Sequence, residues 1–236
     1  MKKNIVFIKN LESNPNNNYS LKNWEIWCKK NNCDIFTLND KIYEDSSFDK
    51  FLVFDLLENE NIPYKQILIT NTDTLIHPNA PNIFTQTENK LCGVFYNSSY
   101  NWLFKSIENY SKYMFSNFTF PYWEYIDTGV IIVNETHKKI FSQISEFYMN
   151  NKENIKQMLN SFNVGTDNPI FNFFIHKNKV KLKVLPYEWN MQDMSRKEVI
   201  NSNLVFTKIG WIYQFNLLQN KNYWVETTYK HLKNND

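Results

Sequence analysis

The sequence predicts an α/β fold in which a mostly parallel central sheet is flanked by helices. Short β-type runs alternate with helical patterns in the order strand, helix, strand, helix, strand, and short connections join them. The chain has 236 residues, of which 42% are hydrophobic and 17% aromatic, so it can bury a full core. We expect a single domain over residues 1–236.

The first half of the chain carries the clearest alternation. Residues 4–8 form a short β-type run, and the polar stretch 11–20 after it favours turns. Ser20 is a suitable N-cap for a helix whose apolar residues recur at three- and four-residue spacing. Residues 34–38 and 66–70 are predicted strands, and 48–57 is a predicted helix between them. Right-handed crossovers then place the carboxyl ends of the strands along one edge, where open α/β sheets bind ligands.

The second half is less regular. Residues 97–126 are rich in aromatic residues without a clean period, which is compatible with helix-to-sheet packing or with an aromatic flap over a site. The polar triplet Asp127, Thr128 and Gly129 precedes a predicted strand at 130–133. Predicted helices follow at 137–148 and 169–175, the second capped by Thr166 or Asp167. We expect another strand at 180–185 and one or two within 204–215.

Charge, cysteine content and hydropathy exclude several classes of function. The net charge of +2 is spread without long runs of like charge, so we expect no nucleic-acid partner. Three cysteines without a Cys-x-x-Cys pair indicate neither a disulfide framework nor a cysteine zinc site. No apolar run approaches the roughly 20 residues of a membrane span, and the first is too short for a signal peptide. We expect a cytoplasmic protein, bacterial or encoded by a virus; the oligomeric state is open.

One stretch, ILITNTDTLIHPNAPNIF at 67–84, raises the question of a ligand site. A β-type run leads directly to Asn71, Thr72 and Asp73. In an extended segment, side chains two residues apart point to the same side, so Asn71 and Asp73 are placed to hold one ligand together. The alternative role of Asp73 is to form the turn itself.

Five segments, taken in order, are similar to motifs of GT-A glycosyltransferases. The segment at 64–84 resembles the strand and Asp-x-Asp motif of these enzymes, and YIDTGVIIVN resembles their Asn/Asp-x-Gly-hydrophobic strand. GTDNPIFNFFI is similar to their Asp-Gln helix start, LPYEWNMQ to their Leu-Pro-x-x-Trp-Asn segment, and KIGWIYQFN lies where a terminal His element is expected. The resemblance is closest to family 8-like proteins, such as glycogenin and bacterial lipopolysaccharide galactosyltransferases, and covers the chain to about residue 216.

The resemblance implies a Rossmann-like GT-A fold and transfer of a hexose from a nucleotide-diphosphate sugar, with UDP favoured, to a hydroxyl acceptor on a glycan, lipid or protein. It also implies retention of anomeric configuration. Mn²⁺ or Mg²⁺ would act as a Lewis acid on the diphosphate, held by Asn71, Asp73 and Gln214. Asn71 replaces the first Asp of the motif and Gln214 the late His, so we expect a weakened metal site. His77 is a less favoured substitute ligand.

The other candidate residues are carried over from the motifs that they match. Residues placed near the transferred sugar as catalytic candidates are Asp127, Asp167 and Asn168. Residues placed against the nucleotide or diphosphate are Asn10, Lys50, Asn71, Thr72, Asp73, Gly129 and Lys208. Purely structural roles are the alternatives, namely caps for the two aspartates and solvated surface positions for the lysines. Possible acceptor-facing residues, or else core residues, are Trp123, Glu124 and Trp189.

Two other functions compete with transfer. The substitutions at Asn71 and Gln214 favour a non-catalytic protein of the same fold that binds a sugar nucleotide or a glycan. A nucleotidyltransferase is the third possibility. It is disfavoured because no glycine-rich basic loop follows the first predicted strand.

Overall fold

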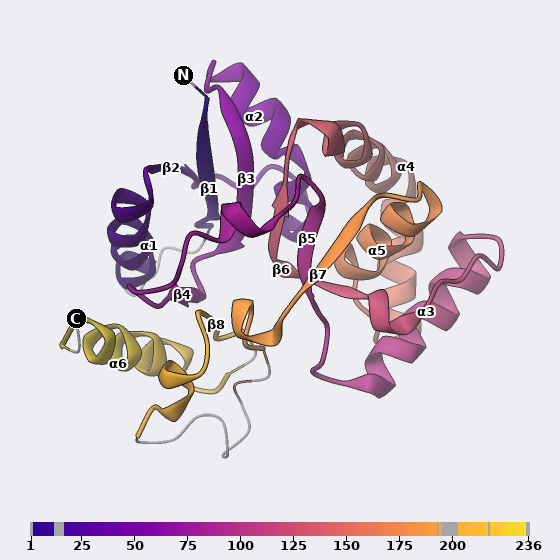
Figure 1. The fold of residues 1–236 in the computed structure, drawn as a ribbon. Helices are drawn as coiled ribbons and strands as arrows, with labels where there is room; N and C mark the ends of the chain where they lie inside the picture. The colour runs from indigo at the N-terminus through magenta and orange to yellow at the C-terminus, as the bar shows by residue number, and fades with distance from the viewer. Residues whose placement is uncertain (1, 12–16, 193, 195–202, 217, 235–236) are drawn as a thin grey trace.

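The fold is described here from a computed structural model, for residues 2–11, 17–192, 194, 203–216 and 218–234 (Figure 1). Its main sheet has the strand order β2-β1-β3-β6-β5-β7. The strands are β1 (Lys3–Lys9), β2 (Cys33–Leu38), β3 (Tyr64–Asn71), β5 (Leu91–Phe95), β6 (Ile126–Val133) and β7 (Leu182–Leu185). β6 runs antiparallel to β3 and β5, whereas the other neighbouring pairs are parallel. The predicted mostly parallel sheet is confirmed.

Helices cover both faces of this sheet (Figure 1). Successive strand residues point to opposite faces, so Val6 and Ile8 pack with Trp24 of α1 (Asn17–Asn31), while Ile5 and Phe7 face the other helices. The elements on that second face are a 3₁₀ segment (Ser46–Leu52), α2 (Val53–Asn59), α3 (Tyr100–Met114), α4 (Lys138–Phe162) and α5 (Asp167–Lys177). Burial on both faces explains why the central strands are almost wholly apolar.

A second, two-stranded sheet brings the end of the chain to the carboxyl end of β3. β4 (Thr74–Ile76) pairs antiparallel with β8 (Ile212–Gln214), and Thr74 lies opposite Gln214. Leu75 and Tyr213 from this sheet pack with Val225 of α6 (Lys221–Asn234). Across the ranges given above, no helix is long and apolar enough to cross a membrane.

Several predicted boundaries differ from the structure. α1 begins at Asn17, so Ser20 is not its cap but a buried residue whose hydroxyl donates to the Thr74 carbonyl at 2.6 Å. The predicted helix at 48–57 is a 3₁₀ segment followed by α2. Of the predicted polar stretch 11–20, residues 12–16 lie outside the described residues, and 17–20 belong to α1.

β4, β5, α3 and α6 were not predicted. β4 and β5 are short, whereas α3 is a 15-residue helix whose buried face was not recognised within the aromatic stretch. Other elements were predicted too short. β6 begins at Ile126, so Asp127 and Gly129 lie within the strand instead of preceding it. α4 extends to Phe162, past a non-helical residue at Asn151. The aromatic stretch at 97–126 therefore contains α3 and its packing contacts.

Candidate active site

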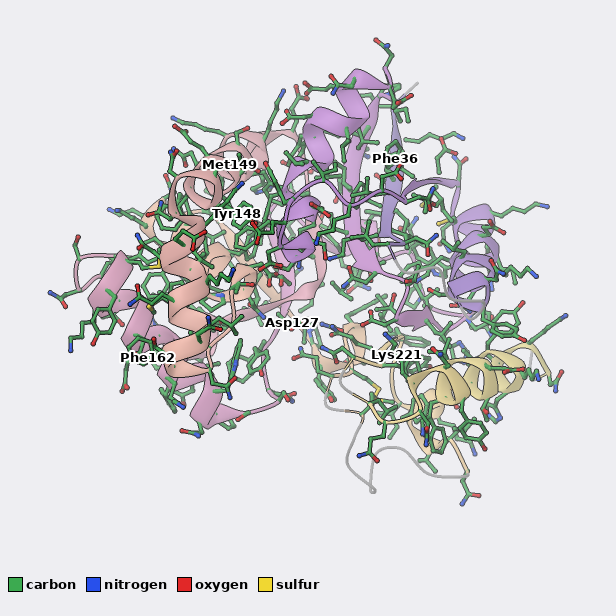
Figure 2. All side chains as sticks on the ribbon, turned by 180° about the vertical axis from the view of Figure 1, so that it is seen from behind. Phe36, Asp127, Tyr148, Met149, Phe162 and Lys221 are labelled. Atoms are coloured by element: carbon green, nitrogen blue, oxygen red, sulfur yellow. The ribbon has the colours of Figure 1, made fainter. Side chains whose placement is uncertain are left out.

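A polar cleft of about 650 Å³ opens where the carboxyl ends of β1 and β3 meet the first residues of β6 and α5. Figure 2 labels Asp127, which in that view lies between α4, marked by Tyr148 and Phe162, and α6, marked by Lys221. Predicted site residues that line the cleft are Lys50, Asn71, Asp127, Gly129, Asp167, Asn168 and Gln214. The sheet edge expected from the strand order is therefore the edge that carries the cleft.

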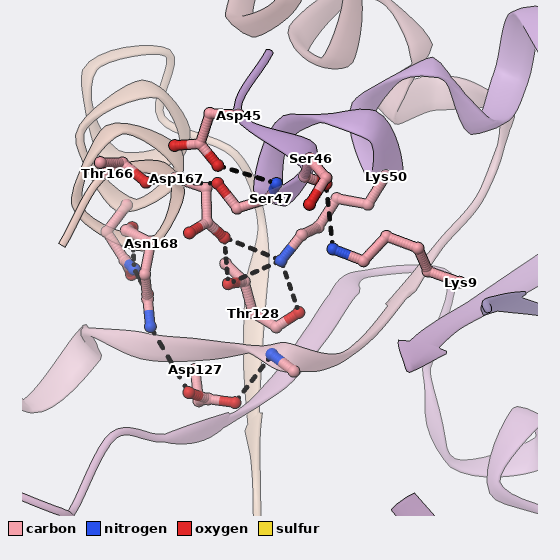
Figure 3. A network of polar contacts seen from close by, with 12 residues as sticks. Lys9, Asp45, Ser46, Ser47, Lys50, Asp127, Thr128, Thr166, Asp167 and Asn168 are labelled. Carbon is pink, nitrogen blue, oxygen red and sulfur yellow. Dashed lines mark hydrogen bonds and ion pairs between the residues drawn. The ribbon is translucent and has the colours of Figure 1, made fainter. Parts of the chain in front are cut away.

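Lys50 and Asp167 form a buried ion pair on one wall of the cleft (Figure 3). The Lys50 ammonium donates to the Asp167 carboxylate at 2.8 Å and to the Thr128 hydroxyl at 3.1 Å and carbonyl at 3.3 Å. The Thr128 hydroxyl also donates to the same Asp167 oxygen at 2.8 Å. Burial alone would raise the pKa of Asp167, but the charge and hydrogen bond of Lys50 outweigh it and hold the pKa below its usual value. The solvated alternative for Lys50 is wrong.

Asp127 lies at the base of the cleft and is held by donors from three elements. Its carboxylate accepts hydrogen bonds from the Gly129 backbone at 2.7 Å, from Asn190 at 3.0 Å and from Asn168 at 3.4 Å. Burial raises the pKa of Asp127, although the bonds from Gly129 and Asn190 oppose that shift. The hydrogen bonds fix the side chain and offset only part of the cost of burying its charge.

Asn172 locks the first turn of α5 to β6, which sets the distance between Asp127 and Asn168. The Ile126 backbone N–H donates to the Asn172 side-chain oxygen, and the Asn172 amide donates to the Ile126 carbonyl, both at 2.9 Å. The same amide reaches the Asn168 carbonyl at 2.9 Å and its side-chain oxygen at 3.0 Å. Thr166 precedes α5, but its side chain makes no capping hydrogen bond. Asp167, the other predicted cap, pairs with Lys50.

Gly129 permits a close approach between β6 and β8. A Cβ at this position would lie 2.2 Å from the Gln214 amide nitrogen and 2.6 Å from an Asp127 carboxylate oxygen. Both distances are shorter than real Cβ contacts, so Gln214 occupies the space that any side chain would fill. The glycine is required here by space and not by a positive φ.

The predicted metal ligands do not all face the cleft. Asn71 and Gln214 line it, and the side-chain oxygen of Gln214 is buried with no hydrogen-bond partner. Asp73 is not a lining residue; it lies with Thr72 in the turn between β3 and β4, and its carbonyl accepts from the Phe215 backbone at 2.8 Å. The extended geometry expected for Asn71 and Asp73 is therefore wrong. Within the described ranges, no group of three His, Cys, Asp or Glu residues could hold a metal.

The remaining predicted residues lie elsewhere. Asn10 donates through its amide to Asn39, and Lys208 is exposed at the end of a 3₁₀ segment; neither lines the cleft. His77, the substitute metal ligand, is outside the lining too and its ring lies 5.8 Å from that of Trp211. Trp189 is buried in the core, which confirms the core role that the sequence analysis gave as the alternative to an acceptor-facing position.

Sequence reasoning missed several residues that line the cleft, among them Lys9, Gln192 and Trp102. The Gln192 amide donates to the Phe95 carbonyl at 3.1 Å, while its side-chain oxygen is buried without a partner. Trp102 packs on the Tyr96 ring at 5.0 Å. Gln192 lies in the segment that resembles a known motif, so the resemblance could have suggested it, whereas nothing in the sequence pattern marked Trp102 or Lys9.

Beside the cleft, a group of aromatic side chains is exposed. Trp123 is 61% exposed and Tyr100 53%, and the Tyr122 ring lies 5.3 Å from Trp123 and 6.4 Å from Tyr100. Phe104 lies 5.2 Å from Tyr122. We call these four residues the aromatic rim. Tyr100 and Phe104 belong to α3, which also supplies cleft-lining residues such as Trp102.

Among the solved structures similar to this chain are several glycosyltransferases. One is a glycosyltransferase involved in glycosylation of the major capsid of PBCV-1. The match covers 95% of this chain and 99% of that protein, with a TM-score of 0.61 and 10% sequence identity. The chain therefore has a glycosyltransferase fold. Mouse xyloside xylosyltransferase 1 matches 92% of it over 98% of its own length, with a TM-score of 0.51 and 12% identity.

The glycosyltransferase GlyE of Streptococcus pneumoniae TIGR4, in its apo form, matches the whole of this chain over 63% of its own length. The TM-score is 0.52 and the identity 12%. No protein-family model and no curated protein matches the sequence. These likenesses establish the fold.

Proposed function

We propose that this chain is a glycosyltransferase that moves a hexose from a nucleotide-diphosphate sugar, with a UDP-sugar favoured, to a hydroxyl on a glycan, lipid or protein. The observation that carries the proposal is the convergence of Asp127, Asp167 and Asn168 on one cleft at the carboxyl edge of a glycosyltransferase-fold sheet. The cleft has the size of an ordinary small-molecule site. A cytoplasmic location, in a bacterium or in the host of a virus, belongs to the same proposal.

In this function Asp127 and Asn168 orient the transferred sugar. A carboxylate accepts hydrogen bonds from sugar hydroxyls, and the donors that already hold Asp127 keep its free acceptor positions directed into the cleft. Asn172 fixes Asn168 from behind, so its amide is pre-positioned. Fixed contacts of this kind lower the barrier by holding the reacting groups in one geometry. We propose that transfer retains the anomeric configuration.

A Mn²⁺ or Mg²⁺ ion belongs to the proposal as a weakly held group. The orphaned, buried oxygen of Gln214 and the side chain of Asn71 offer the oxygen ligands that these ions take, with the Asp73 turn beside them. When bound, the ion would act as a Lewis acid on the leaving diphosphate. Two neutral amides and one peripheral carboxylate supply less negative charge than two carboxylates would, which is why we propose low affinity.

The acceptor would approach over the aromatic rim. Aromatic faces pack against the apolar faces of sugar rings, and an exposed cluster of this kind is uncommon on a surface without a partner. The rim shares α3 with residues that line the cleft, so a glycan lying on Trp123 and Tyr122 would extend toward the donor. We therefore propose Trp123 as an acceptor contact.

The test is release of nucleoside diphosphate from UDP-glucose, UDP-galactose and GDP-mannose, with Mn²⁺, Mg²⁺ or EDTA. We expect one donor to be hydrolysed slowly by the wild type and Asp127→Asn to lower that rate by about a hundredfold, because orienting contacts contribute on that order. Lys112→Gln, on the outer face of α3, serves as the matched control. Failure of every donor to bind or react would refute the proposal.

A non-catalytic binding protein is the second candidate. The observation that favours it is the substitution of carboxylate and imidazole by the amides of Asn71 and Gln214 in the cleft. In that case a donor would bind and remain intact, with no nucleoside diphosphate released.

If a transfer product is formed, proton NMR of its anomeric signal against that of the donor decides whether configuration is retained.

A further inference from the structure

Lys9 is a charged residue of the cleft to which neither the sequence motifs nor the proposed transfer assigns a role. It ends β1, and its Cα pairs with that of Asn71 on β3. Its side chain lines the cleft, and its ammonium donates to the Ser46 carbonyl at 3.0 Å (Figure 3). Among the residues that the structure describes, Lys9 forms no ion pair.

Lys50, one of the two lysines that the family resemblance selects, already has protein partners for its N–H donors. An ammonium has three N–H donors. Those of Lys50 reach two oxygens of Thr128 and one of Asp167, and the Asp167 carboxylate offsets its charge. Within the described residues, Lys9 donates one hydrogen bond, to a neutral carbonyl, which leaves two N–H donors and the positive charge available to a ligand. Of Lys50 and Lys9, Lys9 is the one equipped to bind an anion.

The charge of the cleft supports an anionic ligand. Its charged lining residues are three lysines, Lys9, Lys50 and Lys105, and two aspartates, Asp127 and Asp167, which gives a net charge of 3 − 2 = +1. The Lys50–Asp167 pair cancels within that sum. Lys105 is exposed on α3, whereas Lys9 is partly buried at the carboxyl end of β1, between β2 and β3 in the sheet. Burial and the charge of Lys50 lower the pKa of the Lys9 ammonium, and the carboxylates of Asp167, Asp49 and Asp73 offset that shift only in part.

We propose that Lys9 binds the diphosphate of the donor directly and that the nucleotide consequently binds without a divalent cation. This inference rests on the proposed glycosyltransferase function. Two N–H groups and one positive charge match the oxygens of a diphosphate as charge-assisted hydrogen bonds. A divalent cation held by Asn71 would lie next to the strand position that Lys9 occupies, and the two positive charges would repel each other. Lys9 therefore takes over part of the charge neutralisation that the metal would provide.

The experiment is calorimetric titration of UDP and of uridine in EDTA, which isolates the contribution of the diphosphate. We expect the wild type to bind UDP at least about tenfold more tightly than uridine, since charge-assisted hydrogen bonds are worth about that much. Lys9→Gln should weaken UDP about ten- to a hundredfold and leave uridine within about twofold. Lys9→Arg should keep most of the UDP affinity, and Lys112→Gln all of it. Thermal unfolding midpoints confirm that each variant is folded.

Two results would overturn the inference while leaving the proposed function intact. One is that UDP binds the wild type only with Mn²⁺ or Mg²⁺, falling to the affinity of uridine in EDTA. The other is that folded Lys9→Gln binds UDP as well as the wild type does. A third result, in which no nucleotide or sugar nucleotide binds the wild type with or without metal, would refute the proposed function itself.

Discussion

The ion pair between Lys50 and Asp167 makes a strong prediction about stability. Its side chains are only 6% and 16% exposed. Asp167→Asn keeps the size of the side chain but leaves the Lys50 ammonium buried without a negative partner. Breaking a buried pair from one side costs about 3–5 kcal/mol, because the remaining charge is uncompensated. We expect the free energy of unfolding to fall by that amount at pH 7.

Urea denaturation followed by tryptophan fluorescence measures this loss, and the seven tryptophans of the chain provide the signal. The control is Lys2→Gln, which removes an exposed pair with Glu135 whose side chains are 61% and 70% exposed. That change should cost no more than about 1 kcal/mol. The double variant Lys50→Met with Asp167→Leu removes both charges and should recover most of the loss.

The pH dependence follows from the direction of the shift in pKa. Because the folded-state pKa of Asp167 is below its usual value, the pair contributes its full stability above the unfolded value of about 3.9. That contribution is lost as the pH falls through the lower, folded pKa. The difference between wild type and Asp167→Asn should thus be constant from about pH 5 to 8 and shrink below about pH 4. A loss below about 1 kcal/mol at pH 7, as for a surface pair, would refute this reasoning.

Three further predictions concern the cleft and its rim. Gly129→Ala should displace the Gln214 amide, because the new Cβ would lie 2.2 Å from its nitrogen. We expect this change to cost about 1–3 kcal/mol of stability and to weaken nucleotide binding. Unchanged unfolding and titration curves would contradict this. Gln214→His should raise the affinity of the nucleotide complex for Mn²⁺, measured by titration of the metal at saturating UDP, and no increase would contradict the proposed ligand position. Trp123→Ala should raise the KM for a glycan acceptor and leave donor hydrolysis and stability unchanged. Trp189→Ala, in the core, should instead cost about 3–5 kcal/mol of stability. Equal effects of the two changes on stability would contradict the surface role of Trp123.

The sequence predicts the strands of the main sheet well where burial on both faces makes a run almost wholly apolar. β1 and β3 are such cases, and the edge at which they end carries the cleft. Asp127 and Asp167 could be proposed from the sequence because each lies in a segment that resembles a known motif. Lys50 was proposed as well, but its ion pair with Asp167 could not be predicted, because the two residues meet only through the packing of separate elements.

Other parts of the site depend on contacts that local pattern does not record. Gln214 reaches the cleft because β8 pairs with β4, two strands of three residues that are far apart in the sequence. Asp73 does not line the cleft beside Asn71 because the chain turns after Asn71, and side-chain alternation holds only while a strand continues. Lys9 is the last residue of β1, and nothing in the sequence distinguishes it from other lysines that end strands.

A crystal structure of the protein soaked with UDP-galactose or another donor that binds in solution, in EDTA, tests the central claim most directly. We expect electron density for the donor in the 650 Å³ cleft, with the diphosphate at Lys9 and the sugar over Asp127 and Asn168. Density for the donor at another surface, or a diphosphate held away from Lys9 with the sugar outside the cleft, would contradict it.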